Sequence, residues 1–170
     1  ITIKNLSLSK DFKIISMDSF NFDYVNSKKI KNQLSLKKEN SNYGIEGNNF
    51  DATKLINKII ASDDENSSLF NNFNSKIILK INKTYIDEVN FMNNLSGELN
   101  FKDNEIVDLH LKAFFLNNKK INFSIKTNDK KEKITKLYTD YPKPLIKRYK
   151  FIKGFEDGFL VYQSVKKNGV

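Results

Sequence analysis

The chain has 170 residues, of which 39% are hydrophobic, and its formal net charge is +9. This length suits one domain or a section of a larger protein, and the absence of cysteine excludes disulfide bonds and thiolate metal ligands. Apart from Arg148 the basic residues are scattered lysines. Because proteins recognise bases and phosphates mainly through arginine, this charge predicts a solvated surface and no nucleic-acid partner.

The N-terminal section, residues 1–47, is predicted to form leading strands. Apolar and polar side chains alternate there over short stretches, which is typical of strands with one buried face. Turn-forming residues separate these stretches. The predicted strands are Ile1–Leu8, Phe12–Met17, Phe20–Tyr24, Ile30–Leu36 and Tyr43–Gly47.

A helix and a polar linker are predicted over residues 48–74. Asp51 can cap a helix because its carboxylate accepts hydrogen bonds from the free amides of the first turn. Apolar residues follow at helical spacing between Leu55 and Ile60, which predicts a helix over about 52–61. A helix this short needs a surface to pack against, and we expect it to dock on the sheet and cover one edge of its apolar face.

The strongest pattern in the chain runs from Ser75 to Thr127. A period of two persists there through several long stretches, which predicts an antiparallel ladder of long strands with one apolar face. The residues predicted to form this face are Ile77, Leu79, Ile81, Leu95, Leu99, Phe101, Val107, Leu109, Leu111, Phe115, Ile121, Phe123 and Ile125.

An apolar sheet face must be covered, because burying each Leu, Ile or Phe side chain contributes about 1.5–3 kcal/mol. Three arrangements would do this: a second sheet, a closed barrel, or a curled groove filled by a ligand. Long strands with only short helices as cover favour a curled groove or half-barrel. Periodicity by itself favours an ordinary sandwich.

The remainder of the chain completes a single mainly β segment, residues 1–170, whose main meander occupies 75–170. Pro144 suits the first turn of a helix, and an Asp-Tyr-Pro stretch ends the strand before it. The predicted elements are a strand over Ile134–Thr139, a short helix over about 144–149 and a final strand over Phe159–Val165.

Residues with catalytic or metal-binding chemistry are sparse. His110 is the only histidine, and a lone imidazole on the polar side of a strand indicates a surface residue. The acidic group Asp63, Asp64 and Glu65 lacks the spaced oxygens and glycine turn of a calcium loop. No nucleophile stands with a base, so we expect no enzyme activity, no catalytic residue, no metal and no cofactor.

The order of elements resembles that of the AsmA-like proteins of Gram-negative envelopes, especially large members with a domain of unknown function ahead of their C-terminal region. The resemblance covers about residues 43–165. It rests on the segment Gly47–Asp51 before the helix, on Lys136–Asp140 before the proline-led helix, and on Asp157-Gly158-Phe159-Leu160 at the last strand, where Asp157 stands in place of a glycine of the family pattern.

This resemblance implies an extended, curled sheet with a continuous apolar groove that carries phospholipid acyl chains across the periplasm. The chain would then be an excerpt of a longer protein anchored in the inner membrane, with a part in outer-membrane biogenesis. Its partners would be the acyl chains themselves and, through parts outside this chain, the inner and outer membranes. The thirteen apolar residues of the 75–127 ladder would line the groove. The alternative is a non-enzymatic envelope scaffold or interaction module with a closed β-sandwich core.

Overall fold

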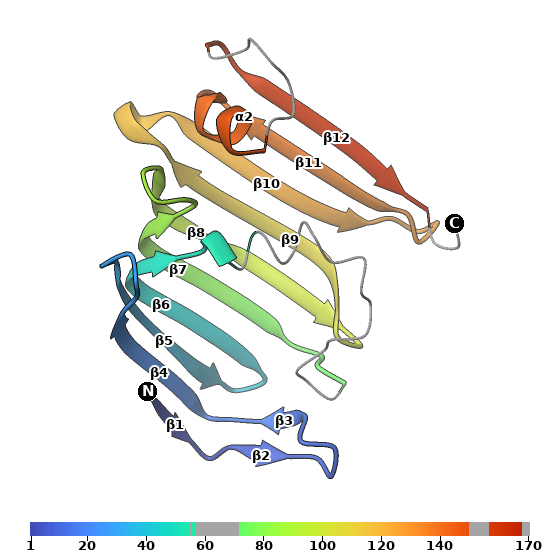
Figure 1. The fold of residues 1–170 in the computed structure, drawn as a ribbon. Helices are drawn as coiled ribbons and strands as arrows, with labels where there is room; N and C mark the ends of the chain where they lie inside the picture. Colours follow the sequence, from blue (N-terminus) through green and yellow to red (C-terminus); the bar gives the residue numbers. More distant parts are fainter. Residues whose placement is uncertain (55, 57–71, 150–156, 168–170) are drawn as a thin grey trace.

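The computed structural model describes residues 1–54, 56, 72–149 and 157–167, and most of them belong to one large sheet (Figure 1). Ten strands form this sheet in the order β1-β4-β5-β6-β7-β8-β9-β10-β11-β12. The strands are β1 (Thr2–Lys4), β4 (Ser19–Val25), β5 (Lys31–Glu39), β6 (Asn42–Asp51), β7 (Lys76–Tyr85), β8 (Phe91–Lys102), β9 (Glu105–Phe114), β10 (Lys120–Thr127), β11 (Lys133–Thr139) and β12 (Leu160–Lys166).

The mainly β prediction is therefore confirmed, but the sheet is mixed. All neighbouring strands are antiparallel except β6 and β7, which run parallel with Tyr43 opposite Ile77 and Asp51 opposite Tyr85. A parallel pair cannot be joined by a tight hairpin, and residues 52–75 provide the longer connection. Among the described residues β1 and β12 each have one neighbour in the sheet, so the sheet is open and does not close into a barrel.

Most of the predicted strands agree with the structure to within three residues at each end, but two differ more. The stretch Ile1–Leu8 is split at Asn5, whose φ of 51° ends β1, and the chain then forms a separate two-stranded sheet from β2 (Ser7–Leu8) and β3 (Ile14–Ser16). The strand predicted to end at Gly47 continues to Asp51 as β6. A register shift between β5 and β6 leaves Asn48 as an extra residue, and such a bulge interrupts the alternation without ending the strand.

Asparagine makes many of the turns between strands. A positive φ is strained for most L-residues, but asparagine and aspartate tolerate it better. The β8–β9 turn uses Asp103 and Asn104, with φ of 51° and 69°, the combination that a two-residue hairpin turn requires. Other asparagines with positive φ are Asn5, Asn40, Asn72, Asn94, Asn117 and Asn118.

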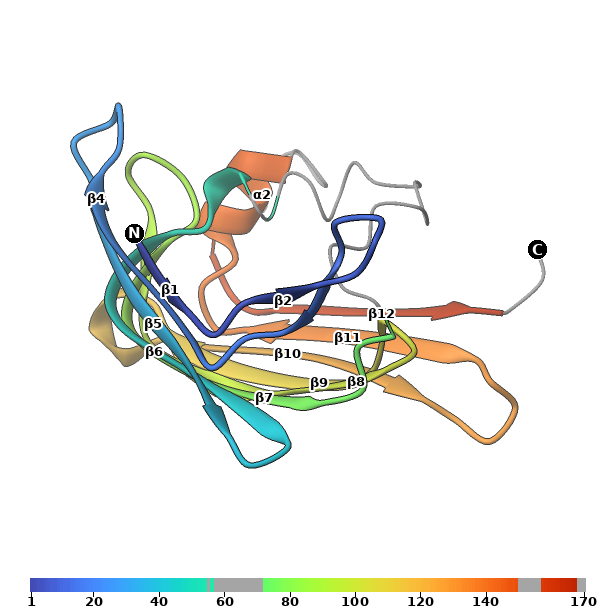
Figure 2. The same cartoon turned by 90° about the horizontal axis from the view of Figure 1, so that it is seen from below.

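One face of the sheet, here called the inner face, carries the described helical segments (Figure 2). The predicted helix at 144–149 is confirmed as α2 (Lys143–Tyr149), and a 3-10 turn, η1 (Leu116–Asn118), follows β9. Thr53 and Lys54 begin the helix predicted at 52–61, where the Ile56 amide donates to the Ala52 carbonyl at 2.9 Å. The rest of that predicted helix lies outside the described residues.

Candidate functional site

A continuous row of apolar residues crosses the inner face from one edge of the sheet to the other. Each member is the direct cross-strand neighbour of the next, so the row runs perpendicular to the strands. We call it the central row; the one member without a side chain is a glycine. It consists of Ile3, Phe20, Leu36, Ile45, Leu79, Gly97, Leu111, Phe123, Leu137 and Tyr162.

The central row is long and is exposed at both ends. Ten strands spaced by about 4.8 Å give it a length of about 43 Å. At the two edges Ile3 is 45% exposed and Tyr162 is 50% exposed, whereas Ile81, beside the row in the middle of the sheet, is 3% exposed. The apolar surface therefore reaches the edges of the sheet without a polar border.

The thirteen residues predicted to line a groove all lie at buried or half-buried positions. Leu79, Leu111 and Phe123 belong to the central row, and two parallel rows flank it. One flanking row is Ile77, Leu99, Leu109 and Ile125, and the other contains Ile81, Leu95 and Ile121. Phe101, Val107 and Phe115 lie near or just beyond the ends of β8 and β9. Their role in binding a ligand remains a prediction.

Part of this inner face is covered by α2. Leu145 of α2 is buried in a cluster with Ile81, Leu95 and Ile121, and the rings of Phe115 and Tyr141 meet edge-on at 5.8 Å. The sequence predicted the helix but not what it covers, because its contacts lie 20 to 60 or so positions earlier in the chain and leave no local signal.

A second cluster covers the opposite margin of the inner face. Phe73 packs between Tyr43 and Phe101, with ring centroids 5.7 and 5.2 Å away, and Met17 is buried beside them. The Phe73 amide donates to the side-chain oxygen of Asn104 at 2.7 Å. Sequence reasoning placed Phe73 in a polar linker, and only its aromatic character hinted that it would be buried.

The other face of the sheet, the outer face, is mainly polar, although Ile78, Tyr138, Val161 and Val165 are exposed on it. On its β4–β7 side a chain of hydrogen bonds crosses four strands. The Gln33 amide donates to Asp23 at 3.1 Å, the Asn48 amide donates to Gln33 at 3.0 Å, and the Asn82 amide donates to Asn48 at 3.1 Å. These side chains fulfil part of their hydrogen-bonding capacity with one another across the strands, so this part of the outer face is polar.

An open hollow of about 830 Å³ crosses β7 to β12 on this polar face. Its lining includes two outward-facing rows, one through Lys80 and Lys112 and one through His110 and Lys136, with residues of the central row between them. His110 lies 3.3 Å from Asp108 at the surface, as expected for a surface residue. The hollow is bordered mainly by outward-facing side chains, and it shares Leu79, Leu111 and Phe123 with the predicted groove.

Asp51 joins the end of β6 to the start of the following helix. Its carboxylate accepts from the Thr53 amide at 3.0 Å and from the Asn26 side chain at 2.8 Å, and its own amide donates to the buried Asn32 at 2.7 Å. The predicted capping role is therefore confirmed. Burial by itself would raise the pKa of Asp51, but the hydrogen bonds from Thr53 and Asn26 and the charge of Lys28 outweigh it and lower the pKa.

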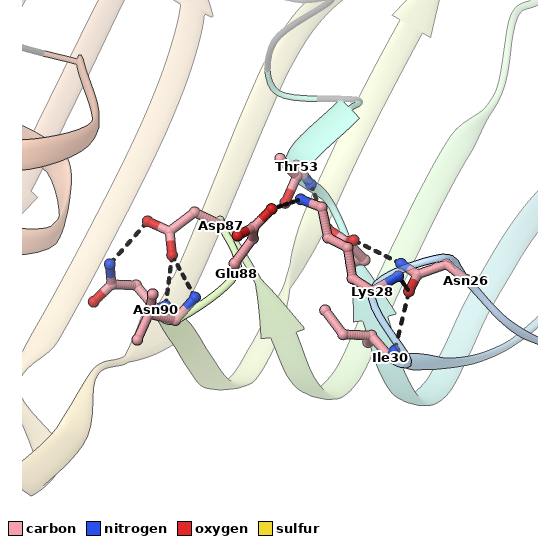
Figure 3. Close-up of polar contacts among 9 residues, drawn as sticks. Asn26, Lys28, Ile30, Thr53, Asp87, Glu88 and Asn90 are labelled. Carbon is pink, nitrogen blue, oxygen red and sulfur yellow. Dashed lines mark hydrogen bonds and ion pairs between the residues drawn. The ribbon is translucent and has the colours of Figure 1, made fainter.

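The turns around this cap are tied together (Figure 3). Lys28 of the β4–β5 turn forms an ion pair with Glu88 of the β7–β8 turn at 3.3 Å. Asp87 closes the β7–β8 turn by accepting hydrogen bonds from the amides of Val89 and Asn90 at 2.8 and 2.6 Å. These polar residues hold loops in place, and none of them forms a nucleophile–base pair.

Within residues 1–54, 56, 72–149 and 157–167, no group of three or more His, Asp or Glu side chains could hold a metal ion. In the same ranges no helix has the length and apolar character needed to cross a bilayer.

Comparison of the chain with models of protein families, with curated proteins and with solved structures finds no match.

Proposed function

We propose that the inner face binds the acyl chains of phospholipids, as one section of a periplasmic conduit between the inner and outer membranes. In this proposal the sheet is curled into a groove or half-barrel whose floor is the central row and its two flanking rows. The resemblance of the element order to AsmA-like envelope proteins supports the same function. The protein would be part of a longer chain anchored in the inner membrane.

The single observation that carries the proposal is the central row, which crosses all ten strands and is exposed at both edges. The hydrocarbon of one lipid leaflet is about 15 Å deep, half of the roughly 30 Å core, so a row of about 43 Å can shelter acyl chains along its length. Contiguous exposed apolar surface often marks a ligand-binding groove or an interaction site. Here Ile3 and Tyr162 extend the apolar surface to both edges.

A scaffold or interaction module with a closed core is the second candidate. The observation that favours it is the cover already present: Leu145 of α2 over Ile81 and Leu95, and Phe73 over the other margin. Both functions need the same sheet, but they differ in whether the middle of the inner face admits a ligand.

The substitution Phe123→Asp tests the proposal. Phe123 is a half-buried member of the central row, and a carboxylate there is costly to leave beside hydrocarbon. We expect the purified protein to contain lipid, measured by extraction and mass spectrometry, and to move fluorescent phospholipid between vesicles. F123D should reduce both by about tenfold, equivalent to about 1.4 kcal/mol.

The matched control is Asn122→Asp, which introduces the same charge one position earlier, on the exposed outer face. N122D should bind and transfer lipid as the unsubstituted protein does. Circular dichroism would show whether each variant is folded. An absence of lipid and transfer in the unsubstituted protein, or equal loss in both variants, would contradict acyl-chain binding and favour the closed scaffold.

A further inference from the structure

Among the described residues, β1 and β12 form the two edges of the sheet, and they differ in how they are protected. Natural edge strands avoid pairing with other chains by being short, by carrying charges or proline, or by bulging. At one edge β1 has three residues and ends with Lys4. At the other, β12 has seven residues and pairs with β11 without a register shift. Its sequence from Phe159 to Val165 contains neither a charge nor a proline.

The side chains of β12 are open to solvent on both faces of the sheet. Val161 is 64% exposed and Val165 is 48% exposed on the outer face, and Tyr162 is 50% exposed on the inner face. Alternate backbone amides and carbonyls of an edge strand point away from the sheet and can pair with another strand. β12 is therefore a longer edge than β1, and its one charge is the terminal Lys166. An edge of this kind is a site for strand addition.

We propose that β12 pairs with β12 of a second copy of this chain, antiparallel and centred on Gln163. The β12 sequence is complementary to itself in this arrangement. In this register Val161 lies opposite Val165 of the partner subunit on the outer face. Tyr162 lies opposite Ser164 of the partner subunit on the inner face. Directly opposed side chains on one face of an antiparallel pair are in contact, so each exposed apolar residue of the outer face gains an apolar neighbour.

The charges at the end of β12 are compatible with this register. Lys166 falls opposite Leu160 of the partner subunit, so the lysines that follow the apolar stretch sit at opposite ends of the joined strands and do not meet. The symmetry is twofold and closes at two copies. Pairing of β12 with β1 of another copy would instead be head-to-tail, would use only the three residues of β1, and would form open-ended chains.

The two-fold axis of this pair is perpendicular to the sheet, so the inner faces of both copies lie on the same side. The sheet becomes continuous through β12. Stable interfaces bury roughly 1,200 Å² or more in total, and a single pair of seven-residue strands buries less. We therefore expect a weak dimer whose population depends on concentration. The pairing is independent of lipid and is measured on lipid-free protein.

Sedimentation equilibrium over a range of concentrations tests the pairing. The mass of the unsubstituted chain should rise from one copy toward two and not beyond. Gln163→Glu places two carboxylates opposite each other at the two-fold axis, where like charges repel, and should weaken the dimer by about tenfold, or about 1.4 kcal/mol. The control Asn122→Glu introduces the same charge on an exposed position of the interior strand β10 and should leave the dimer unchanged.

The register is tested by a double substitution. V161E/V165K places opposite charges against each other twice in the proposed register and should dimerise more tightly than V161E alone, with an effect that salt reduces. A chain that stays monomeric at every concentration, an open-ended assembly, or a Q163E variant that is folded by circular dichroism and still dimerises normally would each overturn the proposal. A failure of the dimer proposal would not contradict acyl-chain binding, because lipid binding and transfer are measured in separate experiments.

Discussion

At the scale of single residues, Gly97 is a position in the sheet that has no room for a side chain. It is the one member of the central row without a side chain. A Cβ atom there would lie 1.9 Å from the His110 carbonyl oxygen, and the residue has a φ of 156°. Both observations indicate that β8 and β9 approach closely at this point and that glycine is required for steric reasons.

We expect Gly97→Ala to lower the free energy of unfolding by about 2 kcal/mol or more, because β8 and β9 must separate to admit the methyl group. Gly44→Ala is the control, since a Cβ at Gly44 meets only the Glu39 side chain at 3.4 Å. It should change stability by less than about 1 kcal/mol. Urea unfolding of both variants measures the difference, and equal effects would contradict the close approach.

At the scale of elements, α2 is seated on the sheet through buried apolar residues that include Leu145 and Ile146. Leu145 is 7% exposed in the cluster with Ile81 and Ile121. We expect Leu145→Ala to cost about 2–4 kcal/mol, because it leaves a cavity between the helix and the sheet. Leu116→Ala serves as control. Leu116 is 58% exposed, so this substitution should change the free energy of unfolding by no more than about 0.5 kcal/mol. Chemical denaturation checks both, and a small effect at Leu145 would mean that α2 is not seated on the sheet.

The contribution of the junction between β6 and the following helix to folding stability is expected to depend on pH, because Asp51 is ionisable. Its pKa in the folded chain is below its ordinary value of 3.8, so the ionised form favours folding. This contribution is fully present above pH 3.8 and is lost as the pH falls through the lower folded pKa.

Asp51→Asn keeps an effective cap but removes the charge. The stability difference between the two proteins should therefore be present at about pH 6 and should shrink at about pH 3. Unfolding measured at both pH values checks this, and a difference that does not change with pH would contradict the role of the Asp51 charge.

At the scale of the whole molecule, the sequence predicts strands better than it predicts their partners. The rows from Ile77 to Ile125 were identifiable because a period of two is a local signal that survives in every long strand. The parallel pairing of β6 and β7 was not predicted, because it joins residues on either side of a long connection. The packing partners of Phe73 and Leu145 were not predicted, for a similar reason. Their burial depends on partners distant in sequence.

The candidate site was predicted in part. The members of the central row between Leu79 and Phe123 follow from alternation, but its continuation to Ile3 and Tyr162 depends on register across strands that are distant in sequence. Register is set by turn geometry and bulges, such as the extra residue at Asn48. These features have only weak local signatures, so the full length of the row emerges only from the assembled sheet.

The single parallel joint between β6 and β7 divides the assembly of the sheet into two stages. Strands β4–β6 on one side and β7–β12 on the other contain only antiparallel neighbours within the main sheet, and most of these are connected by short turns. Such hairpins form on the microsecond timescale, roughly 1–10 μs. The β6–β7 joint must instead close the loop formed by residues 52–75, which costs more chain entropy. The two halves of the sheet can therefore fold early and separately, and their union is expected to limit the folding rate.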